Sequence, residues 1–87
     1  MPLTNDDITL ALAALGWTVG DPARAARLLS LTGLTPVDLR ASAGSPATLA
    51  AVLGFLEAHE PDLVACAAAL DTRAETLVAA RARLEDA

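Results

Sequence analysis

The apolar residues of this chain recur at helical spacing, in short runs separated by glycine and proline. The clearest run places Leu49, Val52, Leu53 and Leu56 at positions i, i+3, i+4 and i+7, which predicts one buried helix face. Three other segments carry a single apolar stripe each: Ala25, Leu28 and Leu29; then Leu63, Cys66, Ala67 and Leu70; then Leu77, Ala80 and Leu84.

Proline and glycine divide the chain into predicted helices. A capping residue followed by proline occurs at Asp21–Pro22, Thr35–Pro36 and Ser45–Pro46, and Glu60–Pro61 opens a fifth helix. Gly20, Gly33 and Gly44 fall where the preceding helices should end. Thr4, with Asp7 three residues later, opens the first helix, and Asp71 or Thr72 opens the sixth. A phosphate-binding loop is the alternative for Gly44–Ser45, but Arg40 is the only cation nearby, so we interpret these residues as helix boundaries.

Composition supports helices throughout. Apolar residues make up 54% of the 87 residues, and most of them are alanine (21) or leucine (16), with one Phe, one Trp and no Tyr. Alanine and leucine favour helices, whereas the aromatic and β-branched residues that favour strands are scarce. We therefore predict an all-α, compact single-domain bundle of five to six short helices, spanning residues 1–87.

The charge balance bears on partners and location. Eleven acidic residues face six arginines and no lysine, a net charge of −5, which disfavours nucleic acids and anionic membrane surfaces as partners. Cys66 is the single cysteine, so no internal disulfide or multi-cysteine zinc site can form. The longest uncharged run, residues 41–56, is interrupted by Gly44 and Pro46 and is too short to span a bilayer. We expect a soluble cytoplasmic protein with no cofactor and no metal.

No residue pattern indicates catalysis. His59 is the only histidine, and the sequence places no nucleophile or carboxylate beside it. Cys66 lies in an apolar stripe without adjacent cations, so we expect a buried, unreactive thiol. No phosphate-binding, zinc-protease or serine-hydrolase motif occurs. We therefore expect no enzyme and no catalytic residue; an enzyme using His59 would lose its activity in a His59→Ala variant.

The first predicted helix has apolar residues on two faces. Ile8, Leu12, Leu15 and Val19 share one face, and Leu10, Ala14 and Trp17 lie roughly opposite. Burying one large apolar side chain is worth about 1.5–3 kcal/mol, against a net stability of about 4–13 kcal/mol for a domain of this size. A small domain rarely surrounds two helices fully. We therefore expect a second chain to cover one of two candidate interfaces: the face of Leu10, Ala14 and Trp17, or a groove of small residues at Ala47, Ala51, Gly54 and Ala58.

Two functions follow as hypotheses. The first is a non-enzymatic module for protein–protein interaction or self-association, a homo-oligomer or a partner-binding domain, in which Trp17 is either an interface anchor or a core residue. The alternative is a helix-turn-helix-like nucleic-acid-binding regulator built from residues 36–43 and the following helix. That following helix would be the reading helix, and it contains no Lys or Arg.

Several segments together resemble a known family. They are ALGW (14–17), DP (21–22), LLSLTGLTPVDLRASAGSP (28–46), LAAVLGFLEAHEP (49–61) and the later ARARL. The chain resembles a small family of alphaproteobacterial proteins catalogued as a domain of unknown function, whose members have about this length. The resemblance covers nearly the whole chain and implies a short all-helical fold, but it implies no activity.

Overall fold

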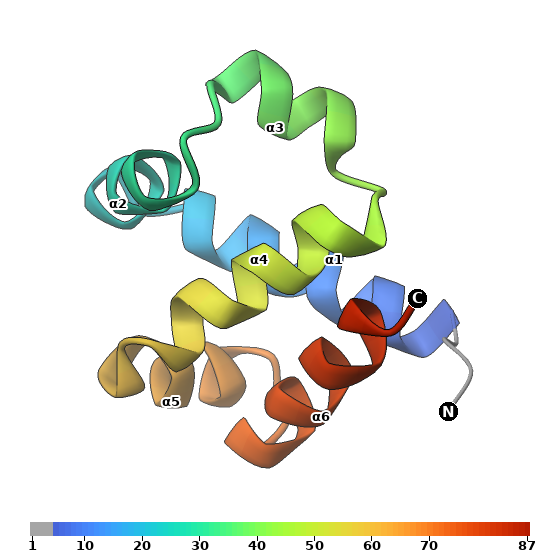
Figure 1. The fold of residues 1–87 in the computed structure, drawn as a ribbon. Coiled ribbons are helices and arrows are strands. Elements are labelled where there is room, and N and C mark those ends of the chain that lie inside the picture. Colours follow the sequence, from blue (N-terminus) through green and yellow to red (C-terminus); the bar gives the residue numbers. More distant parts are fainter. Residues whose placement is uncertain (1–4) are drawn as a thin grey trace.

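The computed structural model describes residues 5–87, which form six α-helices and no strand (Figure 1). They are α1 (Asn5–Val19), α2 (Pro22–Thr32), α3 (Pro36–Ser42), α4 (Pro46–Glu57), α5 (Glu60–Ala69) and α6 (Ala74–Glu85). The all-α prediction is confirmed. None of the helices within residues 5–87 combines the length and the apolar character needed to cross a membrane.

The predicted capping residues start α2 and α3. The Asp21 carboxylate accepts a hydrogen bond from the Arg24 backbone N–H at 3.0 Å, with Pro22 in the first turn. Thr35 and Asp38 form a reciprocal capping box at the start of α3. Gly33 ends α2 in the left-handed region with φ of 74°, a conformation that costs glycine little because it has no Cβ.

Other boundaries differ from the prediction. Ser45 precedes α4 but accepts no capping hydrogen bond through its side chain. The sixth helix begins at Ala74, later than Asp71 or Thr72, because Asp71 adopts a positive φ of 55° and turns the chain after α5. Thr4, the predicted cap of the first helix, lies outside the described residues.

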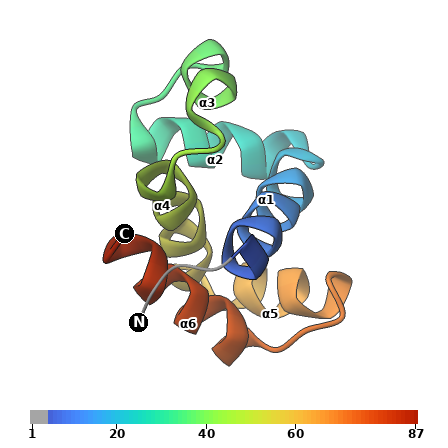
Figure 2. The ribbon, with the colours of Figure 1, turned by 90° about the vertical axis from the view of Figure 1, so that its right-hand side faces the viewer.

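The core is centred on α4, as its sequence stripe predicted. Six residues of this helix are buried, among them Leu49, Leu53 and Leu56, which have no exposed surface. Helices α1 and α6 pack against α4, and α5 closes the side near the start of α6 (Figures 1 and 2). Helix α3 lies at the opposite end from α5 and α6 in both views, and Leu39 is its buried residue.

Helix α1 faces the core along a line between its two predicted apolar faces. Its fully or almost fully buried residues are Asp7, Ala11, Ala14, Leu15 and Thr18, whereas Leu12 and Val19 are 40% and 44% exposed. The two polar residues are accommodated by specific bonds. The Thr18 hydroxyl donates to the Ala14 carbonyl at 2.8 Å, and Arg83 of α6 donates two hydrogen bonds of 2.8 Å to the Asp7 carboxylate.

Candidate interaction surface

The first candidate face, Leu10, Ala14 and Trp17, belongs to the interior of the protein itself. Ala14 is fully buried, and Leu10 and Trp17 are partly buried and pack against the core. The Arg24 guanidinium lies 3.7 Å from the centre of the Trp17 ring and also donates to the Trp17 carbonyl at 3.2 Å. Of the three residues only Leu10 and Trp17 keep exposed surface, and Arg24 covers the indole, so the role of this face as an interface stays a prediction.

The second candidate, the small-residue groove, lies on the outer side of α4. Ala47, Ala51 and Ala58 are exposed, and Gly54 is half-buried. A Cβ placed on Gly54 would lie 3.7 Å from the Arg81 Cδ atom, so α6 already occupies the space beside this glycine.

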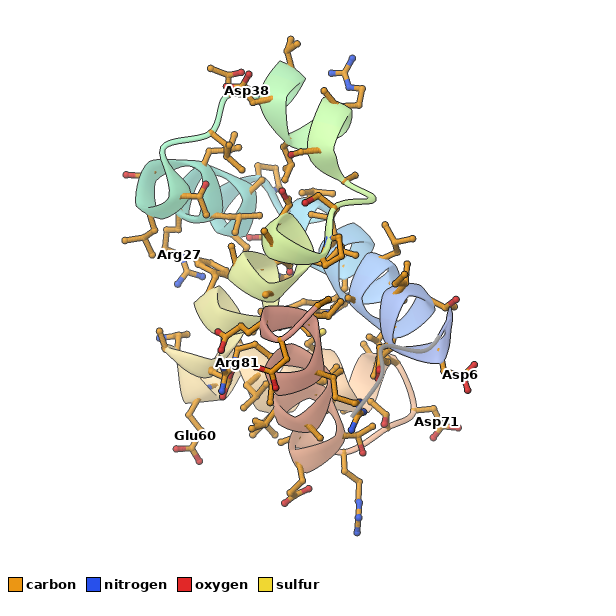
Figure 3. All side chains as sticks on the ribbon, turned by 45° about the vertical axis from the view of Figure 1, so that its right-hand side comes forward. Asp6, Arg27, Asp38, Glu60, Asp71 and Arg81 are labelled. Atoms are coloured by element: carbon orange, nitrogen blue, oxygen red, sulfur yellow. The ribbon has the colours of Figure 1, made fainter. Side chains whose placement is uncertain are left out.

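Ion pairs hold Arg81 in that position. Arg81 pairs with Glu57 of α4 and, at 2.7 Å, with Glu85 one turn further along α6 (Figure 3). Gly54 therefore meets a side chain of the same molecule, and the most exposed part of the groove consists of the three alanines.

Two hollows border these alanines. The larger, of about 530 Å³, lies between the end of α2 and α4 and is lined by Leu31, Leu34, Ala47, Ala51, Phe55 and Ala58, with Thr32 and Thr48. We call it the α2–α4 hollow. The second, of about 390 Å³, lies between α4 and the end of α6, and it shares Ala47 and Ala51 with the first. The two hollows thus form one continuous surface along the outer side of α4.

The α2–α4 hollow combines a protruding side chain with a recessed floor. Leu31 is 73% exposed, the highest value among the large apolar residues described as exposed, whereas Phe55 is 7% exposed. Arg27 lies over the Phe55 ring, 5.7 Å from its centre, and pairs with Asp62 of α5 at 2.9 Å (Figure 3). No residue that lines the hollow is charged.

The two reactive side chains singled out in the sequence lie in opposite surroundings, one exposed and one buried. His59 is exposed at the start of α5. Cys66 is fully buried, and this burial raises the pKa of its thiol to about 11, with Arg24 lowering it and Asp62 raising it to a smaller extent. Within residues 5–87 no group of three or more His, Cys, Asp or Glu side chains is placed to hold a metal ion.

Sequence reasoning missed Leu31, Leu34 and Phe55 as parts of a surface. The sequence does contain a signal for Leu31, because this large apolar residue lies outside the apolar stripe of its own helix, at a position where a polar residue is expected. Phe55 offers none, because its position as the floor of a hollow depends on how the end of α2 packs against α4.

The fold and this surface define a small all-α bundle with a central helix and an uncharged apolar surface beside it. The model of one family matches residues 5–87, nearly the whole chain, and the protein belongs to that family, described as "Protein of unknown function (DUF3572)". Neither a curated protein nor a solved structure matches the chain.

Proposed function

We propose that this protein is a self-association module, and that two copies meet through the α2–α4 hollow in a twofold-symmetric dimer. The observation that carries this proposal is the presence of a projection and a recess on one face. Leu31 projects into solvent beside a hollow with a Phe55 floor and walls of small residues. A twofold interface requires a surface that is complementary to itself, and a projecting leucine beside a recess meets this requirement.

Charge and area are compatible with a second copy as the occupant. The net charge of −5 makes two copies repel each other, but the hollow itself is uncharged, so no like charges are buried against each other there. A stable interface buries about 800 Å² per partner, about one sixth of the 4811 Å² surface of this protein. The neighbouring hollow along α4, which shares Ala47 and Ala51, supplies further contact area.

The nucleic-acid hypothesis has less support. Helix α4 would be its reading helix, yet six of its twelve residues are buried and none is Lys or Arg. A reading helix needs an exposed face with side chains that reach bases and phosphates.

Sedimentation equilibrium on the full chain tests the proposal. We expect a concentration-dependent dimer that Leu31→Lys converts to a monomer. Val64→Lys is the matched control, because Val64 is 53% exposed on α5 and lines none of the described hollows. Equal dimerisation of the two variants would refute the role of this surface, and a wild-type chain that remains monomeric at the highest attainable concentration would refute self-association.

A second variant distinguishes a shape-complementary interface from unspecific hydrophobic association. Ala51→Leu keeps the surface apolar but fills the recess that the partner's leucine would enter. A knob-into-hole dimer is weakened by this change, whereas unspecific hydrophobic association is maintained or strengthened. Retained or stronger association of Ala51→Leu would therefore contradict the proposed geometry.

A further inference from the structure

A separate apolar cavity lies beneath α3. It measures about 400 Å³, within the range of about 300–1,000 Å³ that is common for small-molecule sites. Leu15 and Val19 of α1 and Leu29 of α2 form one side, and Leu39 and Ala43, at the α3 end of the bundle, form the other. We call it the α3 cavity; it shares no lining residue with the α2–α4 hollow.

The hydrogen-bonding chemistry of the α3 cavity is very limited. Besides Arg40, its lining side chains are all Leu, Val, Ala or Pro, so they offer no donor and no acceptor. A bound peptide would bring backbone N–H and C=O groups that need partners, and burying them unpaired costs free energy. A hydrocarbon chain has no such requirement and fits these walls.

Arg40 is the one charged residue that lines the α3 cavity. Within residues 5–87 its guanidinium has no ion pair and no hydrogen bond, and the same holds for Arg73, which lines none of the described hollows. The other four arginines are engaged within the molecule: Arg24 with Trp17, Arg27 with Asp62, Arg81 with Glu57 and Glu85, and Arg83 with Asp7. An available cation at an apolar cavity favours a ligand with an anionic head.

We infer that the α3 cavity binds a free aliphatic monocarboxylate of medium chain length. The chain lies between α3 and the facing sides of α1 and α2, and the carboxylate pairs with Arg40 at the cavity wall. The overall charge of −5 works against unspecific attraction of anions to the rest of the surface. Binding of such an anion therefore reports on this site. The inference is independent of the proposed dimer, because it uses another surface.

Calorimetric titration of the full chain with hexanoate, octanoate and decanoate tests the apolar part. Each added methylene group that is buried should raise the affinity about fourfold, the factor that corresponds to about 0.8 kcal/mol per CH₂. No saturable binding of octanoate or decanoate, or an affinity independent of chain length, would overturn the inference.

The role of Arg40 is tested with octanoate and 1-octanol as a matched pair of probes. Arg40→Gln should lower the ratio of octanoate to 1-octanol affinity about two- to fivefold, the range for an exposed ion pair. Arg73→Gln removes the same charge far from the cavity and should leave this ratio unchanged. The same ratio in wild type and Arg40→Gln, or equal changes in the two variants, would contradict pairing with Arg40.

A larger side chain in the α3 cavity tests whether the hydrocarbon chain of the ligand binds there. Ala43 is half-buried and lines the α3 cavity, so Ala43→Leu should abolish binding of octanoate and 1-octanol alike. Val37→Leu changes an exposed residue on α3 that does not line the cavity, and it should bind both probes as the wild type does. Circular dichroism during heating confirms that both variants fold. A folded Ala43→Leu variant with unchanged affinity would place the ligand elsewhere and refute the site.

Discussion

The Cys66 thiol should make the stability of this protein depend on pH in the alkaline range. The side chain has no exposed surface, and burial raises its pKa from 9.0 to about 11 because the core disfavours the charged thiolate. The chain contains no lysine and no tyrosine, the side chains whose pKa values normally lie near 10. A single buried group therefore dominates the titration of the folded protein in this range.

The direction and size of the effect follow from the two pKa values. Between pH 9 and about 11 the unfolded chain has lost the thiol proton and the folded chain retains it. The free energy of unfolding consequently falls as the pH rises through this window, and the full contribution of the neutral thiol is present below it. One pKa unit corresponds to about 1.4 kcal/mol, so the two states differ by at most about 2.7 kcal/mol. Because the unfolded chain is only half titrated at pH 9 and the folded chain half titrated near pH 11, we expect a loss of about 1–2 kcal/mol across this window.

Urea unfolding at a series of pH values measures this loss. The wild-type protein should show a decreasing free energy of unfolding above pH 9, whereas Cys66→Ala should be nearly independent of pH over the same range. Thiolate absorbance of the folded protein provides a second readout and should rise only as the pH approaches about 11. A wild-type curve parallel to that of Cys66→Ala would refute the assignment of the effect to this thiol.

Further predictions concern the glycines and the core, and urea unfolding measures each of them. Gly54→Ala should stabilise the protein by about 0.5–1 kcal/mol, because alanine restricts the unfolded chain and its Cβ makes an ordinary contact with Arg81; a destabilised variant would indicate that something else needs this space. Gly33→Ala should destabilise by about 1–2 kcal/mol because of its positive φ, and no loss would mean that this turn relaxes. Leu53→Ala should cost about 2–5 kcal/mol, since the side chain is fully buried; a cost below 1 kcal/mol would contradict the central place of α4.

The helix boundaries could be predicted where local chemistry decides them. Asp21 and Thr35 start helices by accepting hydrogen bonds from backbone N–H groups, and Gly33 ends a helix because glycine adopts a positive φ easily. These boundaries depend only on residues close in sequence, so the sequence is sufficient to predict them. The start of α6 could not be predicted in this way. Asp71 and Thr72 are good capping residues, but the chain uses them in the turn that follows α5, with Asp71 at a positive φ.

The buried side of α1 was harder to predict because it depends on how this helix is rotated about its own axis. The apolar positions alone gave no reason to expect the polar Asp7 and Thr18 in the interior, yet both are buried on the core side of this helix. The Thr18 hydroxyl bonds to the Ala14 carbonyl one turn earlier in the same helix, whereas the partner of Asp7 is Arg83, 76 residues away, a pair that sequence spacing does not reveal. Once these two bonds form, the apolar residues on both sides of that line, including Leu10 and Trp17, reach the core from its edges.

Small side chains explain how one short chain covers two apolar helices. Four alanines in these helices are at most 6% exposed: Ala11 and Ala14 of α1, Ala50 of α4 and Ala80 of α6. Such small residues let helix backbones approach closely. Much of the high apolar content is therefore enclosed without large side chains, and exposed large apolar residues remain both on α1 and on other helices. Leu31 at the end of α2 and Val19 at the end of α1 remain exposed; Leu31 lines the α2–α4 hollow and Val19 lines the α3 cavity. If these hollows are occupied as proposed, replacing Leu31 should affect only the mass of the assembly, and replacing Arg40 should affect only the binding of carboxylates.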